Sequence, residues 1–363
     1  MVHGGACTAG ETGCPEARES DLYNFGLPSR GRRGIGSARH ALPVMPKRFE
    51  IRLIAPSGYA EDRAACQRGI ERLQAAGHNV LGADVVDRVA LRFAGTDAER
   101  AADINQLADP DRPLPDVVMA VHGGYGAIAL LDHLDYEGLK ARFANHSCVL
   151  VGHGDFTVIQ CALYARSGIG SLFGPMLVQD FGAGYLREST WRHFWQTLQS
   201  PRTDIAWACP EGQEDMRIEG TLWGGNLSAL CSLTGTPYMP AIDDGILYLE
   251  ETGEQAYRVE RMLYELKVSG VIDRQRAIIL GGLGGQRVSE YDNGYDIEHA
   301  LERFAAVCDV PIIRGLAFGH GRRAPIPSPR HGRRGISPRC AAANCRPSNP
   351  CPRNTRCCRR TGC

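Results

Sequence analysis

The chain lacks any long hydrophobic run, although 43% of its 363 residues are hydrophobic. No apolar stretch approaches the roughly 18 residues that a membrane-spanning helix needs. Residues 1–44 also lack the apolar core of a secretory signal. We therefore expect no membrane partner and a cytoplasmic location. The length is sufficient for two domains with a sizeable core.

Acidic side chains are absent after His320, where eleven arginines lie, so the formal net charge of zero hides an uneven distribution. Residues 45–320 carry 25 basic and 37 acidic side chains, a net charge of −12. So acidic a body lacks the basic patch that binds nucleic-acid phosphates. We expect no nucleic-acid partner.

Six of the fourteen cysteines lie in the tail, where Cys345-x5-Cys351 and Cys357-Cys358 lack the paired spacing of a zinc site, so we expect no metal. Those of the body stand mostly in apolar segments, which predicts small buried side chains: they are Cys66, Cys148, Cys161, Cys209, Cys231 and Cys308. The segment Gly124-x-Gly126-x-x-Ala129 formally fits a dinucleotide fingerprint. No acidic residue ends a second strand about 20 residues later, as that fingerprint requires. We expect no cofactor.

Strand and helix patterns alternate along the body, which predicts an α/β fold with a parallel, Rossmann-like sheet and helices on both faces. In the first half, strands are expected at Ile51–Ala55, Val80–Ala83, Val117–Val121 and Cys148–Val151, and helices at 61–76, 97–108, 126–133, 156–166 and 189–199. In the second half, strands are expected at Gly245–Glu250, Ala277–Gly281 and Pro311–Leu316, and helices at 256–269 and 296–307.

Composition divides the chain into five parts. We expect a disordered leader at 1–44, an N-terminal parallel α/β domain at 45–200, a polar linker at 201–217, a smaller α/β domain at 218–320 and an Arg-, Pro- and Cys-rich tail at 321–363. The tail shows no strand or helix period. Its composition is typical of a shifted reading frame, and a basic nucleic-acid or membrane tail is the alternative.

The segment Val151–Thr157 predicts a sharp turn between a strand and a helix, as in a nucleophile elbow. Such an elbow presents a hydroxyl or thiol at its tip, on a strained backbone. Here the tip is Gly154. Glycine accepts the strained dihedral angles readily, so the turn can persist without a nucleophile. The neighbouring His153 is expected to point away from the tip and to pack in the interior.

Ten short stretches carry a resemblance to the bacterial LD-carboxypeptidases, also called muramoyltetrapeptide carboxypeptidases, over residues from about Ile51 to His320. The matching stretches are Leu53–Tyr59, Phe93–Thr96, Gly123–Gly126, Gly152–Thr157, Phe173–Met176, Gly220–Leu227, Gly235–Pro237, Gly245–Glu250, Tyr257–Leu263 and Phe318–His320. The family is a serine peptidase with a Ser-Glu-His triad. By motif, the resemblance places the serine at Gly154, the glutamate at Glu250 and the histidine at His320.

The resemblance also implies an oxyanion hole made by the N–H of Asp155 and one from Gly123 or Gly124. His122 stands where the family usually has an arginine, and Ile128 and Ala129 stand where it has a small residue and an arginine. An arginine there would suit a substrate that ends in a free carboxylate, because it pairs with a carboxylate through two hydrogen bonds. Its loss is expected to weaken substrate binding.

The function implied by the resemblance is that of a peptidoglycan-recycling enzyme. It would release the terminal D-alanine of muropeptide tetrapeptides by cutting after the L-centre of diaminopimelate, with activity impaired at Gly154. One alternative is the related microcin-immunity peptidase, which cleaves a peptidyl-nucleotide. Others are a non-catalytic muropeptide-binding protein and a decayed member of the family. The family commonly forms a homodimer.

Overall fold

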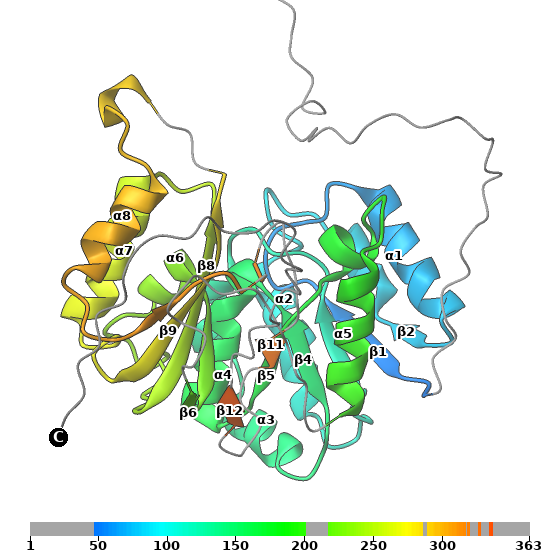
Figure 1. The fold of residues 1–363 in the computed structure, drawn as a ribbon. Coiled ribbons are helices and arrows are strands. Elements are labelled where there is room, and N and C mark those ends of the chain that lie inside the picture. Colours follow the sequence, from blue (N-terminus) through cyan, green and yellow to red (C-terminus); the bar gives the residue numbers. More distant parts are fainter. Residues whose placement is uncertain are drawn as a thin grey trace, which may run out of the picture. The chain divides into compact units, whose positions relative to one another are not determined.

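The computed structural model describes residues 47–200, 217–285, 289–316 and 318–319, together with the backbone of 326–327 and 334–336. The expected leader, residues 201–216 of the expected linker, Cys209 and His320 lie outside the described residues. Within the described part, the chain forms two main sheets with helices packed on them (Figure 1).

The first sheet has the strand order β11-β5-β4-β3-β1-β2. Its parallel strands are β1 (Glu50–Ile54), β2 (Asn79–Leu81), β3 (Val117–Ala120), β4 (Val149–Gly152) and β5 (Ser171–Phe173). The short β11 (Ile326–Pro327) pairs antiparallel with β5. The helices are α1 (Arg63–Ala75), α2 (Asp97–Asn105), α3 (Tyr136–Phe143), α4 (Thr157–Ser167) and α5 (Glu188–Gln199).

Alternating apolar residues of the strands reach opposite faces of this sheet. Val117 and Met119 of β3 join a buried cluster that contains α1 and α5 side chains, such as Leu73 and Trp195. Val118 of the same strand joins a second cluster, which contains side chains of α2, α3 and α4. Both faces are therefore covered, as expected for a parallel sheet.

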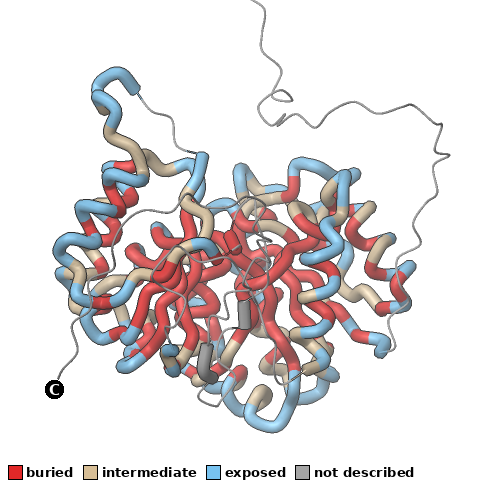
Figure 2. The backbone as a smooth tube through the Cα atoms, viewed as in Figure 1, coloured by how far each residue is buried: buried red, intermediate tan, exposed pale blue. Residues whose placement is uncertain are grey.

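The second sheet has the order β10-β9-β8-β7 and is wholly parallel. Its strands are β7 (Leu222–Asn226), β8 (Gly245–Thr252), β9 (Gln275–Gly284) and β10 (Ile312–Ile313), and its helices are α6 (Leu227–Cys231), α7 (Ala256–Val268) and α8 (Ile297–Ala305). A separate pair joins β6 (Ile218–Gly220) antiparallel to β12 (Arg334–Ile336). One hydrophobic cluster runs from α4 into α6 and the second sheet. Figure 2 shows the strands of both sheets as the buried centre of the body.

Several short helical segments are not α-helices. The 3₁₀ segments are η1 (Ala83–Asp87), η2 (Gln106–Ala108), η3 (Ala127–His133), η4 (Gly154–Phe156) and η6 (Glu290–Asp292), and η5 (Leu177–Phe181) is a π-helical turn. The α-helix expected at 126–133 is thus wrong in type, because η3 occupies the segment. Gly126 precedes it with a φ of +127°, outside the helical region.

The predicted α/β class and the parallel sheets are confirmed. The strand expected at Pro311–Leu316 is wrong in length, since only Ile312–Ile313 pair with β9. The tail was expected to contain no strand, and this was also wrong: β11 and β12 pair with the edges of β5 and β6. Strands of two or three residues among arginines and prolines carry no readable alternation. Their stability comes from the edge that they cover.

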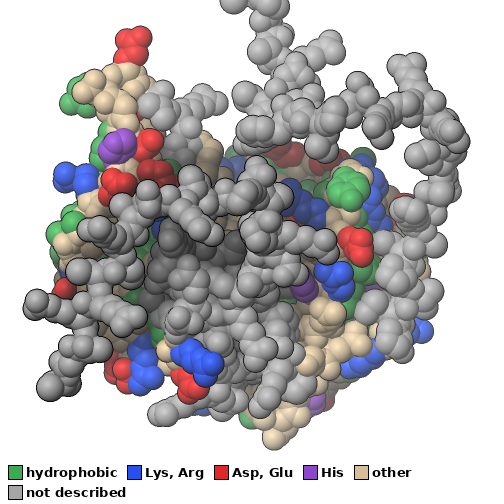
Figure 3. Space-filling model, in the orientation of Figure 1, with side chains coloured by type: hydrophobic (Ala, Val, Ile, Leu, Met, Phe, Trp, Pro, Cys, Tyr) green, Lys and Arg blue, Asp and Glu red, His purple; other side chains and the backbone are tan. Residues whose placement is uncertain are grey.

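The surface and the cysteines give two further results. None of the described helices is long and apolar enough to cross a membrane. On the face in Figure 3, outside the grey atoms, acidic and basic side chains lie intermixed. Four of the body's cysteines are buried, which confirms the prediction for them, whereas Cys308 is only half-buried. The buried ones are Cys66, Cys148, Cys161 and Cys231.

Candidate active site

The expected elbow is present at the carboxyl end of β4. The chain leaves the strand at Gly152, turns through η4 and enters α4 at Thr157. Gly154 has a φ of +61°, in the left-handed region where a side chain is strained. A Cβ at Gly152 would lie 2.4 Å from a ring carbon of the buried Phe156, so the turn also needs a glycine there. The backbone therefore has the shape of an elbow, with no side chain at its tip.

The loop after β3 borders the elbow. A Cβ built on Gly123 would lie 3.9 Å from the amide nitrogen of Asp155 and 3.6 Å from the carbonyl oxygen of His153. Gly124 follows with a φ of +94° and is exposed. The structure thus brings Gly123, Gly124 and the Asp155 N–H to one place.

The carboxylate of Asp155 connects the elbow to the loops that follow β1 and β3. Its Oδ2 accepts hydrogen bonds from the Ser57 hydroxyl and from the Ala127 N–H, both at 2.7 Å. Burial raises the pKa of Asp155, while these two hydrogen bonds and the nearby charges of Arg100 and His122 oppose the rise. The same residue that offers its N–H at the elbow therefore anchors the loops after β1 and β3.

Arg100 of α2 also holds the loops that follow β1 and β3. Its side chain is almost wholly buried and donates to the carbonyl oxygens of Pro56, at 2.6 Å, and Gly126, at 3.0 Å. It also pairs with Asp97 and lies over the ring of Phe93, 4.7 Å from the ring centroid. Hydrogen bonds from a buried guanidinium are strong, so both loops are held firmly.

Glu250 lies at the end of β8 in the second sheet and is fully buried. Its Oε1 accepts a hydrogen bond from the Asn226 side-chain amide at 3.2 Å, and the two residues are register partners in β7 and β8. The Asn226 N–H in turn donates to the Thr157 hydroxyl at 3.1 Å. Because Thr157 begins the helix after the elbow, these hydrogen bonds connect Glu250 to the elbow across the two sheets.

The close approach of the sheets at this point requires Gly225. Its φ is +152°, and a Cβ there would lie 2.5 Å from Cγ2 and Oγ1 of Thr157. The neighbouring Glu251 is also buried and supports the arrangement: it accepts from the Asn226 amide at 3.2 Å, the Ser228 N–H at 2.9 Å and the Thr252 N–H at 3.0 Å.

The chain returns to Glu250 just before position 320. Gly319 has a φ of +93°, and a Cβ on it would lie 2.9 Å from Oε2 of Glu250. His320 itself lies outside the described residues, so its expected contact with Glu250 stays a prediction.

Two histidines flank the elbow and the loop after β3. His153 is buried, as predicted, with its Nε2 3.4 Å from Oδ2 of Asp180. His122 contacts Gln179, whose amide lies 2.5 Å from the histidine Nδ1. Ile128 is half-buried and Ala129 is exposed in η3. Within the described ranges, no group of three His, Cys, Asp or Glu side chains is placed to hold a metal.

Comparisons with known proteins assign both sheets of the body to one family. Residues 51–174 match the LD-carboxypeptidase N-terminal domain, and residues 219–329 match the LD-carboxypeptidase C-terminal domain. The chain belongs to the LD-carboxypeptidase family. The family match continues nine residues beyond His320 and includes β11, which further corrects the expectation that the family pattern ends at His320.

Relatives of two kinds are similar to this LD-carboxypeptidase homologue. The murein tetrapeptide carboxypeptidase of Pseudomonas aeruginosa is 33% identical over 247 residues, covering 63% of this chain and 74% of that protein. The crystal structure of muramoyltetrapeptide carboxypeptidase from Oxalobacter formigenes has a TM-score of 0.71 and 39% identity, covering 79% of this chain and 95% of that one. The microcin C7 self-immunity protein MccF of Escherichia coli is 28% identical over 286 residues, covering 70% and 80%.

Sequence reasoning did not assign a role to Ser57, Arg100, Asn226 or Glu251. Three of them stand in or beside the stretches that carry the family resemblance, which was the one available signal. Arg100 had no such signal, because a basic residue on a helix is ordinarily a solvated one.

Proposed function

We propose that this LD-carboxypeptidase homologue binds muropeptide tetrapeptides ending in D-alanine and that its catalysis is impaired because Gly154 supplies no nucleophile. The observation that carries the proposal is the elbow itself. Gly154 has the left-handed backbone, the Asp155 N–H borders Gly123, and hydrogen bonds connect Glu250 to the elbow helix. This half of the site lacks the hydroxyl at the tip.

In the proposed mechanism, the scissile carbonyl oxygen lies against the N–H of Asp155 and an N–H of Gly123 or Gly124. These donors would stabilise the negative charge of a tetrahedral intermediate. His320 would be the base that takes the nucleophile's proton, and Glu250 would orient its imidazole. With glycine at 154, the site would keep these backbone donors and lack the group that attacks the substrate.

The proposal favours the carboxypeptidase activity over that of MccF. A neighbour named as a muramoyltetrapeptide carboxypeptidase is 39% identical over 95% of its length, whereas the structures of MccF are 24–25% identical. We also propose the domain limits stated above, 45–200 and 218–320. The homodimer and the cytoplasmic location stay predictions.

Calorimetric titration of the unaltered chain with a muropeptide tetrapeptide tests the proposal, with product release followed in the same samples. We expect binding without conversion to tripeptide and D-alanine. Turnover of about 1 per second or more, an ordinary enzymatic rate, would contradict impairment. Neither binding nor turnover would indicate a decayed family member.

A further inference from the structure

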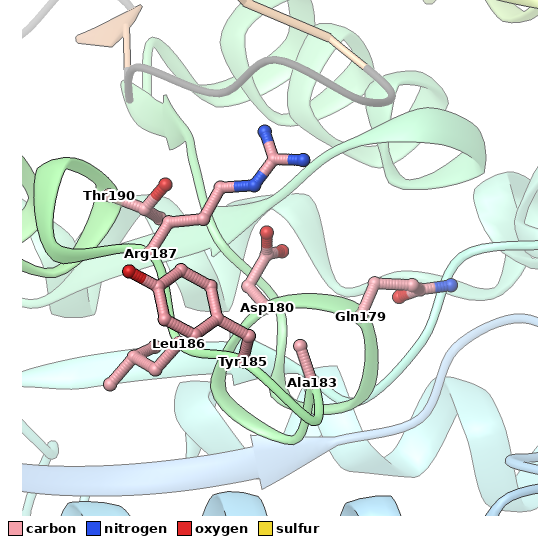
Figure 4. Close-up of a pocket in the computed structure, with 7 residues that line it drawn as sticks. All are labelled: Gln179, Asp180, Ala183, Tyr185, Leu186, Arg187 and Thr190. Carbon is pink, nitrogen blue, oxygen red and sulfur yellow. The ribbon is translucent and has the colours of Figure 1, made fainter. Parts of the chain in front are cut away.

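Polar side chains that line a cavity in the segment after β5 already have partners within the chain (Figure 4). The Asp180 carboxylate accepts from the Met176 N–H at 2.8 Å and lies 3.4 Å from Nε2 of His153. The Gln179 amide contacts His122. The groups near the elbow therefore satisfy one another. A turn in the second half of the chain differs, because it exposes two groups that can react with each other.

This turn lies between η6 and α8 and has Asn293 and Gly294 at its centre. Both residues have a positive φ, +46° and +82°, and the Tyr295 N–H donates to the Asp292 carbonyl oxygen at 2.8 Å. These are the features of a type I′ turn, in which asparagine followed by glycine is favoured. In Figure 1 the segment that contains the turn projects past the end of α8. The backbone therefore accounts for the presence of an Asn-Gly pair in an exposed position.

The same geometry leaves the Asn293 side chain and the Gly294 N–H accessible to each other. Both residues are exposed, and a Cβ built on Gly294 would meet nothing within 4 Å beyond its chain neighbours. The Asn293 N–H donates to the Glu290 carbonyl oxygen at 3.1 Å, and the Tyr295 N–H closes the turn. The Gly294 N–H between them has no acceptor among the described residues. Because glycine carries no side chain, nothing on Gly294 hinders an approach of its nitrogen to the Asn293 Cγ.

We propose that Asn293 is a site of spontaneous deamidation, in which the Gly294 backbone nitrogen attacks the Asn293 Cγ. The bond from this nitrogen to Cγ forms as the Cγ–Nδ2 bond breaks. The side-chain amide leaves as ammonia, together with the Gly294 amide proton, and a succinimide ring remains. Water then opens the ring at one of its two carbonyl carbons. Cleavage at Cγ gives aspartate, and cleavage at the main-chain carbonyl gives isoaspartate, whose backbone contains an additional carbon atom.

The modification changes both the charge and the backbone length of the turn. Glu290, Asp292 and Asp296 are already acidic, so a further carboxylate adds repulsion between like charges. Isoaspartate lengthens the backbone between Asp292 and Tyr295 and so removes the hydrogen bond that closes the turn. The Tyr295 hydroxyl also donates to Glu260 of α7, and Asp296 caps the start of α8. The isoaspartyl form therefore weakens the contact of this segment with both helices.

The test compares the full unaltered chain with a synthetic peptide of residues 289–296, both in mildly alkaline buffer, because the attacking nitrogen is deprotonated. Peptide mapping by mass spectrometry measures conversion, and methyl transfer from S-adenosylmethionine by an isoaspartyl methyltransferase measures isoaspartate. We expect Asn293 in the folded chain to react within about tenfold of the free peptide and at least about tenfold faster than Asn145. Asn145 is the internal control: it is also exposed, but His146 follows it, and the His146 N–H donates to the Phe143 carbonyl oxygen at 3.4 Å.

Asn293→Gly is the matched variant, because glycine retains the left-handed backbone and carries no side-chain amide. It should show no conversion at position 293 and should keep the hydrogen-exchange protection of the Tyr295 N–H. In the unaltered chain, that protection should fall at least about tenfold in the isoaspartyl form. If the folded chain converts more than about tenfold more slowly than the peptide, the turn holds the two groups apart and the proposal is wrong. Conversion at Asn145 as fast as at Asn293 would also overturn it.

Discussion

The two halves of the proposed site consist of different kinds of groups. The elbow half, with Gly123, Gly154 and the Asp155 N–H, presents backbone to the site. The acid half, with Asn226, Glu250 and Glu251, presents buried side chains that hydrogen-bond to one another and to α6. A change at the tip of the elbow half leaves no polar group unpaired. A change in the acid half leaves several buried polar groups without a partner.

This difference explains how the elbow can keep its shape with a glycine at its tip. Gly154 occupies a left-handed backbone conformation that glycine adopts without strain and other residues adopt at a cost. The fold therefore gives no reason to retain a serine there. By contrast, an unpaired buried donor or acceptor costs free energy of folding, so the acid half is retained by stability as well as by chemistry.

Glu251→Ala is expected to give the largest loss of stability. It removes the acceptor of the Asn226 amide, the Ser228 N–H and the Thr252 N–H, all beside the buried β8. We expect the free energy of unfolding to fall by about 3 kcal/mol or more in urea denaturation. Glu254→Ala, which removes a partly exposed ion pair with Arg258, should cost under about 1 kcal/mol. Equal losses of stability in Glu251→Ala and Glu254→Ala would show that the buried hydrogen bonds of the acid half contribute no more than a partly exposed ion pair.

Asp155→Ala tests whether a side chain also matters in the elbow half. It leaves the Ala127 N–H and the Ser57 hydroxyl without their acceptor, so we expect a loss of about 2 kcal/mol. Asp155→Asn retains a carbonyl acceptor and should lose about half as much. Amide hydrogen exchange at Ala127 should quicken in the alanine variant. Unchanged protection there would show that the carboxylate does not hold the loop.

His78 tests the stability of the packing against α5, which lies apart from the site. It is buried, accepts from the Phe49 N–H at 3.3 Å and lies 4.2 Å from the Trp195 ring, centroid to centroid. Burial lowers the pKa of His78 from its ordinary 6.5 to about 4. As the pH falls, the unfolded chain therefore binds this proton first. The stability from neutral His78 is present above pH 6.5 and is lost as the pH falls toward 4.

We expect the unaltered chain to lose about 2 kcal/mol more than His78→Gln between pH 7 and pH 5, in parallel urea titrations. His146→Gln is the control, because His146 is exposed. If His78→Gln and the unaltered chain show the same slope of stability against pH, then His78 does not titrate with a lowered pKa.

Gly154→Ala should give the smallest effect on stability. A side chain at a φ of +61° costs about 1–2 kcal/mol in strain and leaves no partner unpaired. Gly154→Ser should lose the same amount, and thermal melts of the two variants measure this. A loss above about 4 kcal/mol would mean that the tip has no room for a side chain, and the two halves would then be equally intolerant.

Much of the elbow half could be predicted from sequence, because a local pattern specifies it. An apolar run, Gly152–Asp155 and a helical period are enough to predict a strand, a turn and a helix. The acid half depends on which residues of β7 and β8 lie opposite each other. The pairing of Asn226 with Glu250 is a matter of register that no local pattern states. The strands β11 and β12 were not predicted for a related reason. Their stability depends on the strand edge with which each pairs rather than on a pattern in their own residues.

The most direct test of the account is covalent labelling of Gly154→Ser by a serine-directed fluorophosphonate, with the unaltered chain and Gly154→Ser/Glu250→Gln as controls. The account predicts modification at position 154 in the single variant, at a rate at least about a hundredfold above both controls, because the frame still activates a hydroxyl placed at the tip. A folded Gly154→Ser variant that reacts no faster than the unaltered chain would contradict the claim that the remaining groups of the site can still activate a hydroxyl at position 154.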